Sequence, residues 1–205
     1  MKLKTLSVSG YKNLSNVILQ FEHIEGINVL IGNNGSGKSN VLEVLSAIFC
    51  HLYDRSQEIQ FSYKLEYFLD DKKMDVQYDG KELITYEEGV CVDDQIFAKR
   101  NLPSQIIASY SGEDMRLWSS YYEKFYISAV DKLIKGDTQS LPRTPLRYIN
   151  KYYWDIALLS LLISELPNIK TFCKHILNIN KINYISFAFN TKLIKSYKAN
   201  PVTEL

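Results

Sequence analysis

The pattern of hydrophobic and polar positions changes period along the first part of the chain, and each period predicts a different element. Leu6 and Val8 alternate with polar residues, and 17–21 is a second short apolar run, so we expect two strands around a polar turn at 10–13. Residues 27–31 are apolar with little alternation, which predicts a strand covered on both faces. The spacing then becomes helical, because apolar residues recur on one helix face: Val41, Val44, Leu45, Ile48 and Leu52.

In residues 59–88, apolar and polar positions alternate again. Large apolar side chains alternate with polar ones at the start of this stretch: Phe61, Tyr63, Leu65 and Tyr67. Turn signals at 70–73 and 79–80 divide it into about three strands, and these turns are too short for parallel crossovers. We therefore predict an antiparallel meander beside a mixed sheet, with 27–31 as the central strand of that sheet.

The rest of the chain predicts mainly helices. We expect a strand at 105–110, helices at 113–134, 146–164 and 168–177, an exposed loop at 136–145, a last strand at 182–189 and a polar tail after 195. The fold class is therefore α/β. One lobe over 1–205 contains four parts: core strands, loop and first helix (1–58), the meander (59–110), a helical segment (111–180), and a strand with the tail (181–205).

The amino-acid composition indicates a globular domain but does not indicate a function. The chain has 205 residues, 46% of them hydrophobic and 23% charged, which is ordinary for one globular domain. A net charge of +1 gives no overall attraction to nucleic acid or membranes. The three cysteines are far apart and indicate neither a zinc site nor a disulfide framework. No secretory signal is visible and the most apolar run, 156–163, is too short to span a bilayer, so we expect a cytoplasmic protein without membrane contact.

The most informative motif lies between the apolar run 27–31 and the first helix. It fits the phosphate-binding pattern G-x-x-x-x-G-K-[ST] over Gly32, Asn33, Asn34, Gly35, Ser36, Gly37, Lys38 and Ser39. Such a loop turns backbone N–H groups toward phosphates at a helix N-terminus. Lys38 is then expected on the β- and γ-phosphates, and the Ser39 hydroxyl on Mg²⁺. The sequence therefore predicts a nucleotide site that takes ATP and Mg²⁺.

The segment Gly32 to Glu43 resembles the Walker A region of ABC-type ATPases, and is most similar to the branch of SMC, RecF and overcoming-lysogenization-defect proteins. The turn 10–13 is similar to the aromatic-Arg/Lys-Asn/Ser turn of that branch. Segments 107–113 and 147–153 resemble bacterial AAA-family ATPases found beside restriction and anti-phage systems.

This resemblance implies a P-loop NTPase fold, of which the chain would be the N-terminal lobe. It also implies that Asn40 and Lys12 contact the nucleotide, although Lys12 is equally compatible with an ordinary solvated turn lysine. It further implies a homodimer or larger complex, in which a signature segment of another subunit covers the γ-phosphate. A role in DNA transactions or phage defence, with DNA or defence proteins as partners, follows from the resemblance alone.

The chain departs from this branch where a Walker B strand ending in Asp-Glu is expected. Residues 67–71 end in Asp-Asp but lie in the predicted hairpin. Residues 126–131, behind a signature-like stretch at 109–113, end in Asp131, but Lys132 stands in place of the glutamate and the spacing is helical. Whether the chain is an enzyme therefore stays open. Two alternatives remain: a degenerate, non-hydrolysing interaction module that holds nucleotide, or a P-loop small-molecule kinase, for which only scattered arginines are present.

Overall fold

The computed structural model describes residues 1–21, 27–110, 115–135, 144–149, 154–181, 183, 184 and 186. The chain clusters into two compact units, and each is described here by itself. The first unit comprises Met1–Ile106, Asp114–Tyr126 and Arg143–Arg147, and it contains the predicted nucleotide site. The second comprises Ile107–Glu113, Ile127–Pro142 and Tyr148–Leu205.

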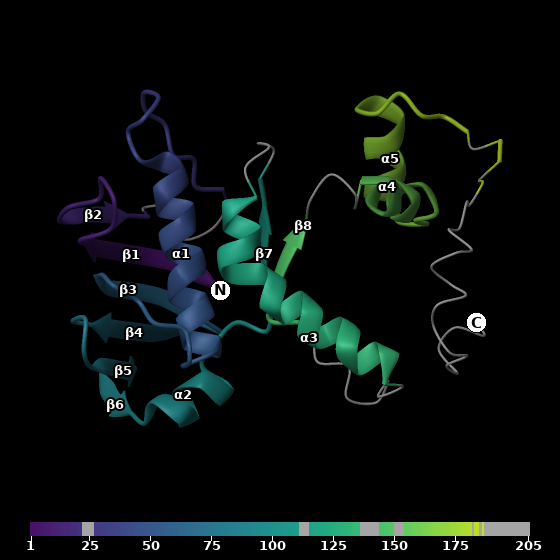
Figure 1. Ribbon diagram of the computed structural model, residues 1–205. Helices are drawn as coiled ribbons and strands as arrows, with labels where there is room; N and C mark the ends of the chain where they lie inside the picture. The colour runs from purple at the N-terminus through teal and green to yellow at the C-terminus, as the bar shows by residue number, and fades with distance from the viewer. Residues whose placement is uncertain are drawn as a thin grey trace. The chain divides into compact units, whose positions relative to one another are not determined.

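A six-stranded sheet in the order β2-β1-β3-β4-β5-β6 forms the first unit (Figure 1). Every pairing in this sheet is antiparallel. The strands are β1 (Lys2–Ser9), β2 (Val17–Gln20), β3 (Ser62–Leu69), β4 (Lys72–Tyr78), β5 (Leu83–Glu87) and β6 (Val90–Val92). The predicted first two strands and the predicted meander are confirmed, with β6 as one strand more than expected.

Tight turns fix the register of the meander. Asp70 and Asp71 join β3 to β4, and both have positive φ angles, 50° and 62°. Two consecutive left-handed residues are typical of a type I′ hairpin turn, whose twist matches that of the strands. The turn sets Leu65 opposite Val76, and both side chains face the same buried side of the sheet.

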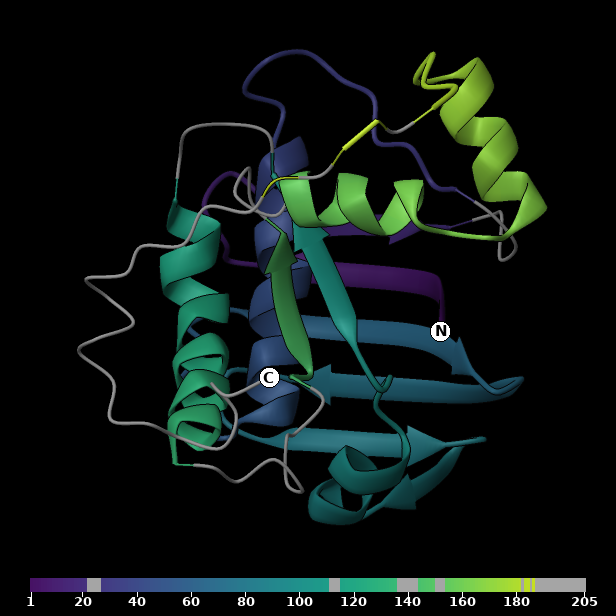
Figure 2. The ribbon, with the colours of Figure 1, turned by 90° about the vertical axis from the view of Figure 1, so that its right-hand side faces the viewer.

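Helix α1 (Lys38–Tyr53) lies across this buried side of the sheet (Figures 1 and 2). Its apolar stripe is fully buried at Val44, Ile48 and Leu52, as the spacing predicts. At the far edge, α2 (Asp94–Arg100) begins with Asp93, whose carboxylate accepts from the N–H groups of residues 95 and 96. The core of the first unit is therefore a helix–sheet layer.

The remaining elements are short. Strands β7 (Ile106–Ser109) and β8 (Leu146–Ile149) pair with each other, and their arrows point the same way in Figure 2. A π-helical turn, η1 (Trp118–Tyr122), continues into α3 (Glu123–Ile134). The second unit contains α4 (Trp154–Leu162) and α5 (Pro167–His175). These elements confirm the predicted strand at 105–110 and the helices at 113–134 and 168–177.

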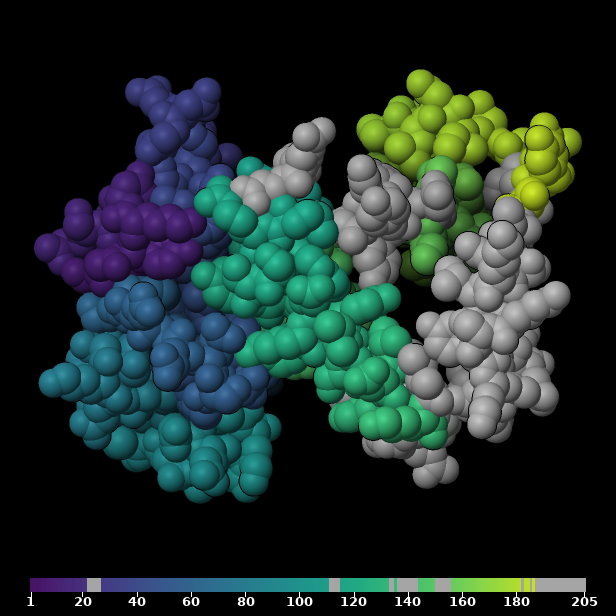
Figure 3. Space-filling model, viewed as in Figure 1, coloured from purple at the N-terminus to yellow at the C-terminus, as the bar shows by residue number. Residues whose placement is uncertain are grey.

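The predicted central strand at 27–31 is wrong. Residues 27–33 form no regular structure, and Ile27, Val29 and Ile31 are 87%, 71% and 91% exposed. Within the described residues no strand pairs with this segment. An isolated strand leaves its backbone N–H and C=O groups without partners, and a parallel partner must come from a remote part of a chain. The segment and the loop that follows it project from the first unit in dark blue (Figure 3).

The predicted helix at 146–164 is also wrong in its first part. Leu146 and Tyr148 are buried while Arg147 is exposed, which is the alternation of a strand, and the helix covers only α4. The apolar residues at 146, 149 and 153 also fitted a helical period. Pairing with β7 makes 146–149 a strand instead. The predicted strand at 182–189 and most of the loop at 136–145 lie outside the described residues, and 183, 184 and 186 have no regular structure.

Among the described helices, none alone has the length and apolar composition needed to cross a membrane. Residues 156–162 and 167–175 meet that test only as a pair, and they are bent by 115° against each other.

Candidate functional site

The predicted phosphate-binding loop is an exposed turn that leads directly into α1. The Ser36 N–H donates to the carbonyl oxygen of Asn33 at 3.2 Å, which closes a tight turn over Asn33 to Ser36. Gly37 is the N-cap of α1 and has a φ of 97°. A Cβ at Gly37 would lie 2.9 Å from Leu14 Cδ2, so both conformation and space require glycine here.

The start of α1 presents free backbone donors. No side chain caps the helix, and its first internal hydrogen bond runs from the Val41 N–H to the Gly37 carbonyl oxygen, at 3.0 Å. In the described part of the chain, the N–H groups of Lys38, Ser39 and Asn40 donate to no protein acceptor. Unpaired N–H groups and the positive end of the helix dipole together favour an anion at this position.

The Lys38 ammonium is folded back onto the loop. Its Nζ donates to the carbonyl oxygens of Gly32 and Asn33, at 2.7 and 2.8 Å. The loop backbone therefore holds the positive charge of Lys38 at the start of the loop, against the carbonyl oxygens of Gly32 and Asn33.

Asn13 joins the turn after β1 to the loop, and the sequence analysis missed its role. Its Nδ2 donates to the Gly35 carbonyl oxygen at 2.9 Å, and its Oδ1 accepts from Asn40 Nδ2 at 2.7 Å. Gly37 packs against the same side chain. The predicted residue Asn40 thus acts on the loop through Asn13. The only sequence signal for Asn13 is its place in the turn 10–13, because its partners are remote in sequence.

The structure places Lys12 on a carboxylate of α1. Its Nζ pairs with Glu43 Oε2, and the same oxygen accepts the Tyr11 hydroxyl at 2.8 Å. Tyr11 also lies 3.4 Å, hydroxyl to hydroxyl, from Tyr121 of η1. Burial, and then the hydrogen bonds to Tyr121 and Glu43, raise the pKa of Tyr11, so its hydroxyl stays a proton donor. Glu43 was not among the predicted site residues.

Neither acidic stretch considered for Walker B forms a strand end beside the loop. Asp70 and Asp71 occupy the β3–β4 turn, and Asp131 lies in α3, so a strand at 126–131 is excluded. The signature-like residues 111–113 lie outside the described part of the chain. Among the residues that the structure describes, no Asp-Glu pair follows an apolar strand.

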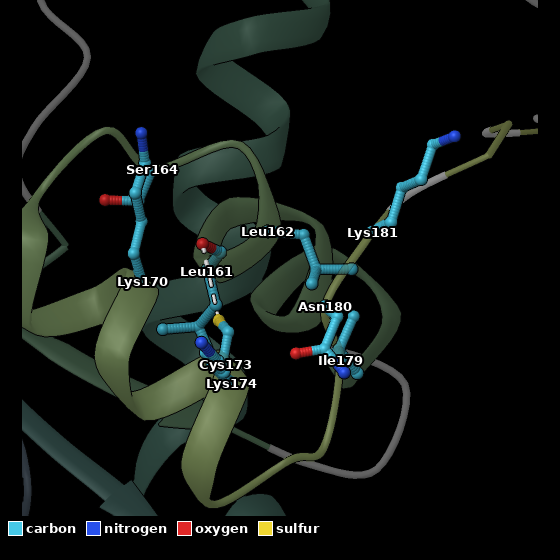
Figure 4. Close-up of a pocket in the computed structure, with 9 residues that line it drawn as sticks. All are labelled: Leu161, Leu162, Ser164, Lys170, Cys173, Lys174, Ile179, Asn180 and Lys181. Atoms are coloured by element: carbon cyan, nitrogen blue, oxygen red, sulfur yellow. Dashed lines mark hydrogen bonds between the residues drawn. The ribbon is translucent and has the colours of Figure 1, made fainter.

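The second unit contains a hollow of about 340 Å³ between α4, α5 and residues 179–181. Cys173 lines it, with Sγ 3.8 Å from the Leu161 carbonyl oxygen (Figure 4). Lysines line its edge, but Lys181 extends away from the other residues (Figure 4), and Lys170 is paired with Glu165. The cationic groups therefore do not converge on one point as an anion site requires.

Comparisons with known proteins identify the family of the chain. Residues 1–203 match the family described as AAA ATPase domain. A DNA replication and repair protein RecF from Bacillus velezensis is 25% identical over 182 residues, covering 80% of this chain and 43% of the relative. The RecF protein of Mannheimia succiniciproducens is 49% identical over 45 residues, which are 22% of this chain and 12% of the relative. The chain thus spans less than half the length of these relatives.

Proposed function

This chain belongs to the AAA ATPase domain family, and we propose that its loop at 32–39 binds ATP with Mg²⁺. One observation carries the proposal: within the described residues, the first three N–H groups of α1 donate to no protein acceptor, and the Lys38 ammonium is bound to the loop that leads into this helix. A nucleoside polyphosphate supplies the multiple negative charge that such an arrangement favours. Helix start, glycine loop and lysine together therefore make a phosphate cradle.

In this proposal, each predicted residue has a role in nucleotide binding. Gly32 to Gly37 supply the loop backbone, and Lys38 would leave its two carbonyl partners for the β- and γ-phosphates. Ser39 is exposed in the first turn of α1, where its hydroxyl could join the Mg²⁺ shell. Asn40 keeps the loop in shape through Asn13. Lys12 would add a second cation from the neighbouring turn.

We further propose that the chain acts as the N-terminal part of an SMC/RecF-like ATPase in the cytoplasm, working on DNA as a homodimer or a larger complex. The RecF relatives are DNA replication and repair proteins, which supports a role on DNA over a role in phage defence. ATP turnover by the chain alone should be very slow, because the described residues offer no Asp-Glu pair to position water.

Lys38→Ala tests the assignment of the loop. Because charge-assisted hydrogen bonds contribute about 1.5–3 kcal/mol, we expect ATP affinity to fall roughly 10- to 100-fold, while stability changes little. Titration with a fluorescent ATP analogue and Mg²⁺, followed by circular dichroism of the variant, measures both. Lys170→Ala, at an exposed lysine of the second unit, is the matched control and should bind normally. Unchanged affinity in Lys38→Ala would refute the nucleotide site.

A nucleotide-holding interaction module is the second candidate, and the same missing Asp-Glu pair favours it. Phosphate release from the pure chain separates the two, with and without DNA added. Turnover that rises with DNA supports the ATPase, whereas tight ATP binding with no turnover under any condition supports the module. Transfer of phosphate to a small-molecule acceptor would instead indicate a kinase.

A further inference from the structure

Glu43 is a buried carboxylate close to the predicted phosphate site. It lies on α1 four residues after Ser39, and therefore on the same side of the helix one turn further along. Its residue surface is 8% exposed. A carboxylate that is removed from water in this way needs partners to remain charged.

Its partners come from a single turn of the chain. The Tyr11 hydroxyl and the Lys12 ammonium both meet Glu43 Oε2. The next residue, Asn13, holds the phosphate-binding loop through the Gly35 carbonyl oxygen. The Lys12 side chain is still 40% exposed, so it can swing toward solvent without breaking the core. The turn 11–13 therefore connects Glu43 directly to the loop.

Both cations assigned to the phosphates are bound to oxygens of the protein. Lys38 donates to two loop carbonyls, and Lys12 pairs with the carboxylate of Glu43. A bound polyphosphate competes with these oxygens for both ammonium groups. The competition is stronger at Lys12, because Glu43 is a full negative charge whereas a carbonyl is only a dipole.

We infer that Glu43 holds Lys12 in the nucleotide-free protein and releases it to the polyphosphate, and so sets the affinity of the loop for nucleotide. The inference rests on the proposed function, since it requires that residues 32–39 bind a nucleoside triphosphate. The exchange replaces one ion pair by another. Tyr11 makes it feasible, because its hydroxyl still donates to Glu43 after Lys12 has left, and the carboxylate keeps a partner.

Glu43→Gln tests this positioning role. The amide oxygen still accepts from Tyr11 but no longer attracts the Lys12 charge. A half-exposed ion pair contributes up to about 1 kcal/mol, so ATP should bind roughly fivefold more tightly. The measurement is fluorescent-ATP titration of the full chain with Mg²⁺. A purely structural role for Glu43 predicts weaker binding, so the sign of the change separates the two.

Two further variants sharpen the result. Lys12→Met in the Glu43→Gln background should abolish the gain, because the released cation is then missing. Asp54→Asn is the matched control: Asp54 follows the other end of α1 and pairs with Lys124 at 2.7 Å, far along the helix from the loop. Its removal should leave ATP affinity unchanged.

Unchanged or weaker ATP binding in Glu43→Gln overturns the inference. If that variant does not fold, Tyr11→Phe provides an independent test. It removes the competing donor to Oε2, so Lys12 is held more tightly and ATP affinity should fall; unchanged or higher affinity overturns the inference. Wild-type protein that fails to bind ATP, or binds it independently of Lys38, refutes the proposed function instead. Binding that depends on Lys38 but not on Glu43 leaves the proposed function intact.

Discussion

The meander strand β3 and the segment 27–31 are both rich in large apolar residues, yet they have opposite structures. In β3, Leu65 and Tyr67 are fully buried under α1. In 27–31, Ile27, Val29 and Ile31 are largely exposed. The difference lies in the backbone: a hairpin turn brings β4 to β3, while no described strand reaches 27–31. Apolar composition therefore makes a strand only where a partner for its N–H and C=O groups is close.

The test with the largest expected effect shortens one large apolar side chain in each of the two segments. Leu65→Ala leaves a cavity between β3 and α1, and should lower the free energy of unfolding by about 2–5 kcal/mol. Ile31→Ala, the matched truncation of an exposed residue, should change it by less than about 0.5 kcal/mol. Urea unfolding followed by circular dichroism measures both. A large loss in Ile31→Ala would show that the segment packs against something in solution.

A second test concerns a buried ionisable group under the meander. His51 of α1 packs edge-on against Tyr78, with ring centroids 5.2 Å apart. Burial, and then the charge of Arg55, lower the pKa of His51 to about 4. As the pH falls, His51 is therefore protonated in the unfolded chain before it is protonated in the folded one. Its contribution to the free energy of unfolding is fully present above pH 6.5 and is lost as the pH falls toward 4.

Between pH 7 and pH 5, His51 should account for about 2 kcal/mol of lost stability. Urea unfolding at a series of pH values measures the loss. In His51→Phe, which keeps an aromatic ring against Tyr78, this part of the pH dependence should disappear. The same slope in wild type and variant would contradict a neutral, buried His51.

The test with the smallest expected effect on stability compares two glycines of the loop. Gly35 and Gly37 both have positive φ angles, 83° and 97°, so alanine strains either position. A Cβ at Gly35 meets nothing within 4 Å, whereas a Cβ at Gly37 meets Leu14 and Asn13. Each variant should cost about 1 kcal/mol of backbone strain, and Gly37→Ala about 1 kcal/mol more. Thermal unfolding of the two variants measures the difference in stability. Equal losses of stability would show that Asn13 and Leu14 move aside at little cost.

The sequence predicted those parts of the fold whose causes are local. The turns at 70–73 and 79–80 and the apolar stripe of α1 are short-range signals, and they gave the meander and the helix correctly. Residues 27–31 had the apolar composition of a buried strand, but no described strand pairs with them. Residues 146–149 fitted both a helix and a strand, and pairing with the remote strand β7 decided for the strand. The motif at 32–39 predicted the position of the loop, but it gave no indication that Asn13 and Glu43 contact the site. Their roles come from contacts of the turn after β1 with the loop and with α1, which follow it by 22 and 32 residues.

The position of β1 in the sheet also determines when the core of the first unit can be completed during synthesis. All other neighbouring strands follow one another along the chain, but β1 pairs with β3 across the loop and α1, with Leu6 opposite Leu65. Until β3 has emerged from the ribosome, this edge of β1 has no partner strand, and the apolar stripe of α1 has only β1 and β2 to cover. Pairing between strands that are far apart in sequence slows folding relative to local contacts. The core beneath α1 is therefore complete only after the meander downstream of it has been translated.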